Sequence, residues 1–319
     1  MGSLRILHVH DASRQNPYLN AQAANVRWLL PALRRLGHEV EEVPLERLAA
    51  VREAGPFDIV HLHGAAGGIR PATRAVLTTR YGSETPQPPF VALTYRQLRA
   101  DGTRAIAVIP PALDMANIPP ERDAGDHLAM SFDGRDEYAL GAAIAVATRQ
   151  ERPLVVVLDE TAELSESCAA ALRIGEQGGW LRVERLGRFD FPTAIWSAAA
   201  YLSFGRRGFD MAALTAMASG TPVIVFEGTP VSELVLHGES GFVCPSAELA
   251  NMALENLDLL SESLARSRAR ILFDADAAAF RYVQLYRQLA RAQGEQPPRG
   301  EPRERRNPEH TRKDGGTAA

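Results

Sequence analysis

Short apolar segments alternate with helical segments along this chain, and the alternation occurs twice. Short apolar runs fit buried strands, whereas apolar residues three or four positions apart fit helices that cover a sheet. Parallel strands need long crossover connections, so this alternation favours parallel sheets with helices on both faces. The sequence therefore predicts an α/β fold with two doubly wound domains.

The first half carries five predicted strands, at residues 4–9, 39–43, 58–63, 90–94 and 105–109. Helices are predicted at residues 20–36, 45–52 and 71–80, and Pro71 suits the first turn of the last one. Four prolines between residues 110 and 120 indicate a linker, since proline disfavours continuation of a helix or a central strand. We therefore expect an N-terminal domain over residues 1–118.

The second half repeats the pattern, with strands at residues 127–132, 154–158, 182–186, 200–203 and 222–226. Helices are predicted at residues 137–149, 163–175, 192–198 and 211–219, and the stretch 246–292 is helical throughout. We expect a C-terminal domain over residues 119–292. Residues 293–319 are rich in Pro, Gly, Glu and Arg, and they are expected to form a disordered tail.

Composition excludes several classes of function. The net charge is −4, which does not indicate a nucleic-acid partner, and no apolar run is long enough to span a bilayer. The two cysteines lie far apart, so neither a metal site nor a disulfide is expected, and a cytoplasmic location is the default. The one lysine is Lys313, in the expected tail, so an anion in the folded part must be held by arginine, histidine or backbone N–H groups.

The loops that follow the predicted strands are the places where a doubly wound sheet binds ligands. The loop after the first strand, residues 10–16, contains no glycine, which argues against an NAD or FAD cofactor there. The loop after residues 200–203 contains Gly205, Arg206, Arg207 and Gly208 directly before a helix. Backbone N–H groups and guanidinium groups at that point suit a pyrophosphate, while a solvated loop surface is the alternative.

Residues 208–245 resemble the donor-binding half of GT-B glycosyltransferases of the retaining family 4. The family pattern is E-x-F-G-x-x-x-x-E-A-M-A-x-G-x-P-V. This sequence matches it at Phe209, at residues 216–218, at Gly220 and at residues 222–223. Matches elsewhere are weaker, and they lie at residues 37–40, 58–63, 108–110, Asp114, Phe273 and Tyr286. The first half is shorter than the family by about one β-α unit, between residues 63 and 105, and residues 90–95 match either of two family strands.

The resemblance implies transfer of a sugar from a nucleoside diphosphate sugar, with retention and without a cofactor or a required metal. It also implies the GT-B architecture, in which two doubly wound, Rossmann-like domains face each other across a cleft and the terminal helices pack back toward the first domain. In that architecture the first domain is expected to hold an unknown acceptor and the second domain to hold the donor. The donor-binding candidates are Arg135, Arg206, Arg207, Gly208, Thr215, Thr229 and Glu233. The pattern's two glutamates fall on Arg207 and Thr215, and its phosphate-binding lysine is absent although Arg135 is present.

The candidates in the first half are His63 for catalysis and Asp11, Asn16 and His61 for the acceptor side. Arg207 is a second catalytic candidate, because it stands where the pattern has a glutamate. For each histidine the alternative is a buried ring that is hydrogen-bonded to its surroundings, and for Glu233 it is a carboxylate that caps a helix.

Three functions are consistent with these residues. The first is an active glycosyltransferase. The second is a degenerate relative that binds or regulates a partner protein, because the paired glutamates are missing. The third is another enzyme on the same scaffold, such as an epimerase, because a fold alone does not fix a function.

Overall fold

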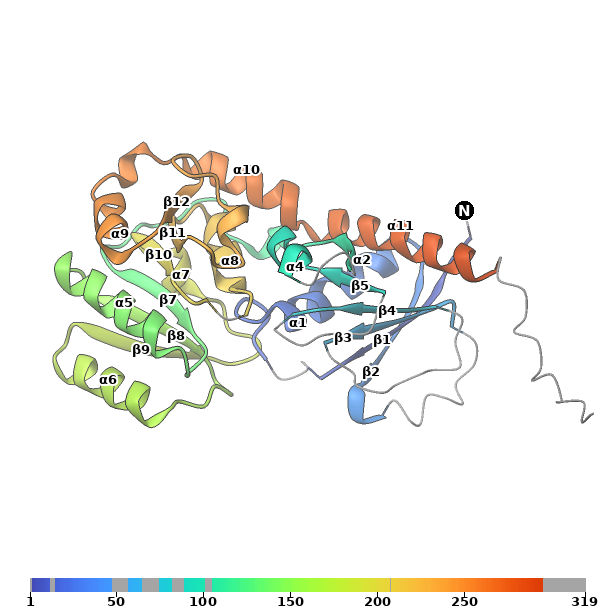
Figure 1. The fold of residues 1–319 in the computed structure, drawn as a ribbon, viewed down its shortest axis with the longest axis horizontal. Helices are drawn as coiled ribbons and strands as arrows, with labels where there is room; N and C mark the ends of the chain where they lie inside the picture. The colour runs from blue at the N-terminus through green and yellow to red at the C-terminus, as the bar shows by residue number, and fades with distance from the viewer. Residues whose placement is uncertain are drawn as a thin grey trace, which may run out of the picture.

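The computed structural model describes residues 2–11, 15–47, 57–64, 75–81, 89–100, 105–206 and 208–294. The described chain forms two parallel six-stranded sheets, one in each half (Figure 1). The N-terminal sheet has the order β2-β1-β3-β4-β5-β6. Its strands are β1 (Arg5–His10), β2 (Glu39–Pro44), β3 (Ile59–His63), β4 (Val76–Thr79), β5 (Phe90–Ala92) and β6 (Ala105–Val108).

The C-terminal sheet has the order β12-β11-β10-β7-β8-β9. Its strands are β7 (Leu128–Phe132), β8 (Leu154–Asp159), β9 (Leu181–Leu186), β10 (Ala200–Ser203), β11 (Val223–Phe226) and β12 (Gly241–Cys244). Successive strands run outward in one direction from β7 and in the other direction from β10. The order therefore reverses between these two neighbours, and such a switch point is where doubly wound sheets bind ligands.

Helices cover both sheets (Figure 1). In the first half, α1 (Ala21–Ala24), a π-helical turn (Asn25–Leu29) and α2 (Leu30–Arg35) follow β1, and α4 (Tyr95–Ala100) follows β5. The second half contains α5 (Glu137–Arg149), α6 (Glu166–Gln177), α7 (Thr193–Trp196), α8 (Met211–Ser219), α9 (Ala247–Leu254), α10 (Glu262–Phe273) and α11 (Ala275–Gly294). No helix among the described residues is long and apolar enough to cross a membrane.

One apolar core extends through both halves of the molecule. It includes Ile6 and Leu77 of the first sheet, Leu214 of α8, and Tyr282 of α11, all fully buried. Figure 1 shows α11 lying along the N-terminal sheet, although it follows the C-terminal domain in sequence. An exposed 2.6 Å ion pair also joins Arg35 of α2 to Asp276 of α11. The last helix therefore completes the core of the first domain.

The structure corrects the expected helix at residues 71–80. Residues 76–79 form the strand β4, which pairs in parallel with both β3 and β5. Residues 71–74, including Pro71, lie outside the described residues. Leu77, Thr78 and Thr79 are buried on both faces of the sheet, so this short stretch shows neither strand alternation nor a helical stripe.

Other differences concern short elements. The helix α4 and the strand β12 are not predicted by the apolar pattern, and the expected helix at 45–52 is described only as a 3₁₀ turn at Leu45–Arg47. The expected tail lies outside the described residues from residue 295 onward. In contrast, the ranges 137–149 and 211–219 are confirmed as the bounds of α5 and α8.

Candidate functional site

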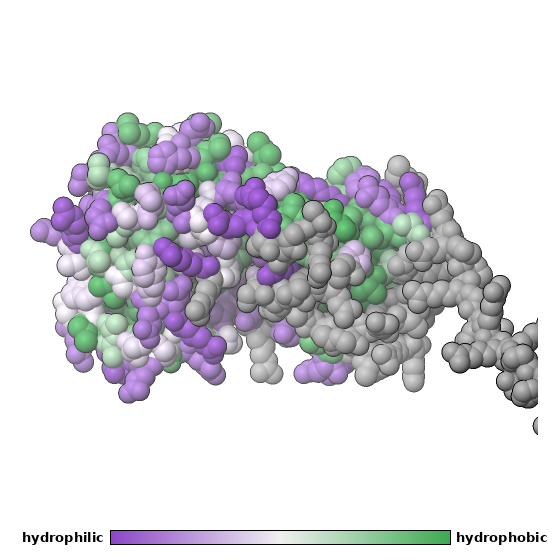
Figure 2. All heavy atoms as spheres, viewed as in Figure 1, coloured by the Kyte–Doolittle hydropathy of each residue, from purple (hydrophilic) through white to green (hydrophobic). Residues whose placement is uncertain are grey.

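A cleft of about 850 Å³ lies at the carboxyl ends of β7, β8 and β10, at the switch point of the C-terminal sheet. Both domains line it. The N-terminal domain contributes Asp11, Asn20, Gln22 and Tyr81, among others. Figure 2 shows hydrophilic residues gathered along the part of the C-terminal domain that faces the N-terminal domain. The cleft has the size and the position expected for a small-molecule site in a doubly wound fold.

Carboxylates predominate among the charged groups of this cleft. The described acidic residues that line it are Asp11, Asp133, Asp136, Asp159, Glu163 and Asp210. Arg135 is the basic residue among the described lining residues, and its guanidinium lies 3.4 Å from the Glu163 carboxylate. Both of these side chains are largely exposed to solvent, so the pair is weak and Arg135 is free to turn toward a ligand.

Two helices begin at the cleft, and an aspartate directly precedes each of them. Asp136 caps α5 by accepting a 3.1 Å hydrogen bond from the N–H of Ala139, and Asp210 caps α8 through the N–H of Ala213 at 3.2 Å. Gly208, a predicted donor-binding residue, lines the cleft just before α8 with a φ of +73°. Glycine suits that left-handed conformation, which brings the chain sharply into the helix.

The structure describes Arg206, one of the two arginines of the loop before α8. The Arg206 guanidinium lies 4.9 Å from the centre of the Tyr138 ring, a cation–π contact beside the cleft. The backbone N–H of Arg206 approaches the Asp136 carboxylate at 3.4 Å. Arg207 lies outside the described residues.

Two predicted donor-binding threonines lie in the protein interior rather than in the cleft lining. Thr215 is fully buried on α8, and its hydroxyl donates to the carbonyl of Ala212 at 2.8 Å. Thr229 is also fully buried, and its hydroxyl donates to the carbonyl of Phe226 at 2.9 Å. Both hydroxyls are therefore engaged by the local backbone.

Glu233 spans the two domains. Its carboxylate accepts hydrogen bonds from the backbone N–H groups of Tyr95 and Arg96, at the start of α4, and the Arg96 contact is 2.9 Å long. The Arg99 guanidinium on the same helix lies 3.6 Å from this carboxylate. Glu233 thus caps a helix, as in the alternative interpretation above, but the helix belongs to the other domain.

The two polar candidates of the first loop have different surroundings. Asp11 lines the cleft and accepts a 2.8 Å hydrogen bond from the Gln22 amide. Asn16 is fully buried between the domains. Its backbone N–H donates to Asp159 at 2.6 Å, and its side-chain amide donates to the carbonyls of Gly187 and Asp190. Asn16 therefore joins the two domains.

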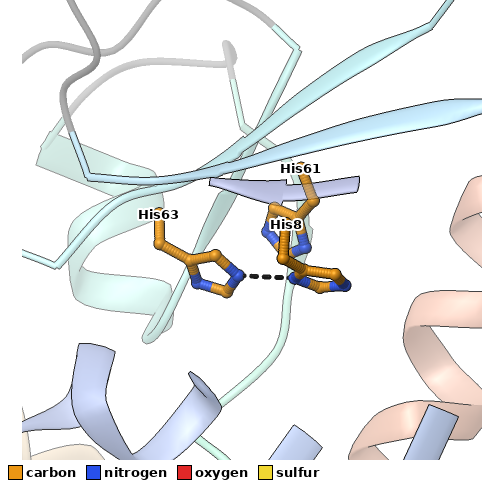
Figure 3. A group of neighbouring side chains, drawn as sticks. All are labelled: His8, His61 and His63. Carbon is orange, nitrogen blue, oxygen red and sulfur yellow. Dashed lines mark hydrogen bonds between the residues drawn. The ribbon is translucent and has the colours of Figure 1, made fainter. Parts of the chain in front are cut away.

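His61 and His63 form a buried cluster with His8, which the sequence did not single out (Figure 3). His8 and His61 are neighbours in the register of β1 and β3, so all three rings lie on one face of the sheet. Figure 3 shows His63 pointing toward His8, with a 2.7 Å hydrogen bond between the two rings. His8 lies between two apolar residues of β1, and this alternation is the sequence signal that would have indicated it.

The cluster reaches neighbouring hydroxyl groups. His63 contacts the Tyr81 hydroxyl at 2.6 Å, and Tyr81 lines the cleft. His61 contacts the hydroxyls of Tyr286 at 2.7 Å and Thr79 at 2.6 Å. One nitrogen from each ring lies within 4.8 Å of one nitrogen from each of the other two rings. Five of the six ring nitrogens are already hydrogen-bonded, and Nε2 of His8 is the exception.

Burial keeps these rings neutral. It lowers the pKa of His61 to about 3, and it lowers the pKa of His8 and of His63 well below the ordinary value. A neutral ring donates one hydrogen bond and accepts another, which fits the hydroxyl partners. The two predicted histidines therefore lie behind the cleft, and His63 is connected to it through Tyr81.

Comparison with known proteins agrees with this architecture. Residues 137–262 match the family model described as glycosyl transferases group 1. None of the curated proteins is similar enough in sequence to count as a match.

Among solved structures, one that is similar is AviGT4, a glycosyltransferase involved in avilamycin A biosynthesis. Its TM-score is 0.72 and its sequence identity is 22%, and the match covers 90% of this chain and 98% of that one. Sucrose-phosphate synthase from Thermosynechococcus elongatus is similar with a TM-score of 0.65 and 16% identity, over 90% and 100% of the chains. HepE of Anabaena in complex with UDP has a TM-score of 0.60 and 13% identity, over 89% and 100%. The chain therefore has the two-domain GT-B fold of these proteins, and its residues 137–262 resemble the glycosyl transferases group 1 family.

Proposed function

We propose that this protein binds a nucleoside diphosphate sugar in the cleft between its domains and transfers the sugar to an acceptor on the side of the N-terminal domain. The observation that carries the proposal is the cleft of about 850 Å³ at the switch point, lined by residues of both domains. A donor and an acceptor must meet for transfer, and a site between two domains allows each domain to hold one of them. HepE, which shares the fold, has been solved in complex with UDP-glucose.

The chemistry requires stabilisation of a diphosphate leaving group, on which negative charge develops as the sugar departs. Arg135 lines the cleft, and Arg206 lies beside it on the loop before α8. We propose that these two arginines, together with Arg207, hold the diphosphate in place of the lysine of the family pattern. Guanidinium groups suit this task because they donate parallel hydrogen bonds to phosphate oxygens.

The test is nucleotide binding by isothermal titration calorimetry, using UDP and GDP on the wild-type protein and on Arg135→Ala with Arg207→Ala. We expect the double variant to lose binding. Arg173→Ala with Arg182→Ala removes the same charge from exposed positions away from the lining residues, and this control should bind as the wild type does. Unchanged affinity in the cleft variant would overturn the assignment of the arginines.

Retention and independence from metal are the finer parts of the proposal, and they rest on the resemblance to retaining family 4. Turnover of a panel of UDP- and GDP-sugars should continue in the presence of EDTA. The anomeric configuration of the product, read by NMR, should equal that of the donor. Loss of turnover in EDTA would contradict independence from metal. A product of inverted configuration would contradict retention.

A second candidate function is a binding or regulatory subunit without transferase activity. Three observations favour it: the pattern's second glutamate is replaced by the buried Thr215, Glu233 is held by the other domain, and the start of α8 carries Asp210. Specific nucleotide binding, seen as a thermal shift, without donor hydrolysis or transfer would support this function. Transfer to any acceptor would exclude it.

A further inference from the structure

Asp210 occupies the end of α8 that faces the cleft. The residue lines the cleft and is half-buried, directly after Gly208 and Phe209. All nine residues of α8 are buried, so the helix is fixed in the core and its first turn cannot move away from the cleft. Asp210 therefore lies at a fixed point of the candidate donor site.

The carboxylate of Asp210 is held by several donors. It accepts hydrogen bonds from the hydroxyls of Tyr201 at 2.9 Å, Ser203 at 2.7 Å and Ser131 at 3.1 Å, and from the N–H of Ala213. These partners come from β7, β10 and α8 itself. A carboxylate with four partners on three elements does not turn away when a ligand enters.

The start of a helix carries partial positive charge and unpaired N–H groups, which attract anions. In α8 the anion at this position is the carboxylate of the chain itself. A diphosphate that approaches the same turn meets a fixed negative charge within a few ångströms, in a site that is partly shielded from water. The family pattern quoted above has glycine at this position, after the phenylalanine that Phe209 matches.

We propose that Asp210 sets the affinity of the cleft for phosphate-bearing ligands, and that it weakens the binding of a free nucleoside diphosphate more than that of a nucleotide sugar. This inference rests on the proposed function. The terminal phosphate of UDP has a second pKa of about 6, so near neutral pH UDP carries about one more negative charge than UDP-glucose. A fixed carboxylate therefore repels the product more strongly than the donor.

The test compares the wild type with Asp210→Asn, which keeps the shape and the capping oxygen of the side chain but removes its charge. Dissociation constants are measured by calorimetry for pyrophosphate, UDP, UDP-glucose and uridine. We expect UDP and pyrophosphate to bind about tenfold more tightly to Asp210→Asn, UDP-glucose to gain less, and uridine to be unchanged. Asp210→Ser, which also caps a helix without a charge, is the second variant if the first does not fold.

Asp274→Asn is the matched control. Asp274 caps the start of α11 by accepting from the N–H groups of Asp276 and Ala277, and it does not line the cleft. The control changes the net charge equally, so it should leave all four affinities unchanged. A gain of the same size in the control would show a general charge effect and overturn the inference.

The remaining outcomes separate this inference from the proposed function. If UDP binds equally to the wild type and to Asp210→Asn, the inference is wrong and the proposed function stands. If no nucleotide binds either protein but pyrophosphate binds the variant more tightly, the effect of Asp210 on phosphate affinity stands, whereas the discrimination between nucleotides and the proposed function are both wrong. If neither pyrophosphate nor any nucleotide binds either protein, both are wrong.

Discussion

The Glu233 carboxylate in the C-terminal domain accepts a 2.9 Å hydrogen bond from the backbone N–H of Arg96 in the N-terminal domain. The first N–H groups of a helix have no partner within the helix, and here the opposite domain supplies one. The bond therefore couples the structure of α4 to the relative position of the two domains.

Replacing Glu233 with Gln should lower the free energy of unfolding by roughly 1 kcal/mol, because the charged cap of α4 and the contact with Arg99 are weakened. Thermal and urea unfolding measure the change. Glu227→Gln, at an exposed position on the preceding loop, should have no effect. Equal stability of the two variants would show that the interdomain cap contributes nothing.

Replacing Asn16 with Ala should lower the free energy of unfolding by about 2 kcal/mol, because the carbonyls of Gly187 and Asp190 lose their buried donor. Urea unfolding provides the measurement. Asn117→Ala removes an exposed amide that contacts only Asp114 among the described residues, so its effect should be much smaller. A loss below 0.5 kcal/mol, roughly the lower limit for a hydrogen bond, would mean that the Asn16 amide does not stabilise the contact between the domains.

The free energy of unfolding should decrease as the pH falls below 6.5. In the folded protein the pKa of His61 is about 3, against 6.5 for an ordinary histidine, so below pH 6.5 the unfolded chain binds a proton that the folded chain does not. His61 alone should therefore lower the stability by about 1.4 kcal/mol per pH unit, down to its folded pKa. His8 and His63 act in the same direction.

Urea unfolding at several pH values, with His61→Gln beside the wild type, isolates the contribution of His61. The variant should show a shallower slope between pH 6 and pH 4, roughly the window in which an ordinary histidine already holds its proton and the buried His61 does not. His237→Gln, at an exposed position, should keep the slope of the wild type. Parallel slopes for all three proteins would mean that His61 is not buried as a neutral ring.

Replacing Gly220 with Ala should destabilise the protein by more than about 1 kcal/mol. Gly220 ends α8 with a φ of +81°, and a Cβ there would lie 2.8 Å from the Arg266 guanidinium, which donates to the carbonyl of Ser219. Gly141→Ala is the matched control, because Gly141 lies inside α5 with open space around it. That change should be neutral or stabilising by up to about 1 kcal/mol. Equal effects would contradict the argument.

The helices whose bounds the sequence predicts well have capping residues at their ends. Asp136 and Asp210 cap α5 and α8, and Gly220 ends α8, so the bounds of these helices follow from local residues. The strand β4 does not follow, because its four residues become a strand only by pairing with β3 and β5. A short apolar run without such signals is ambiguous between helix and strand.

Some features of the candidate site also follow from the sequence, whereas others do not. The order of elements predicts a site at the loops after the strands, and the structure has a cleft there. The interdomain partners of Asn16 and Glu233 lie more than 130 residues away in sequence, and no local pattern indicates them. Asp210 had a local signal, since an aspartate directly before a helix is a typical cap, but its chemical role depends on the cleft that surrounds it.

The hydrogen bond between His61 and Tyr286 joins residues 225 positions apart, and Thr79 meets Tyr282 across 203 positions. During synthesis the first sheet therefore leaves the ribosome long before α11 exists to cover it. Until then, a polar layer of histidine and threonine faces water in place of its tyrosine partners. The N-terminal domain thus reaches its final form only after the C-terminal domain has been made, and a chain interrupted before residue 275 lacks part of the core of its first domain.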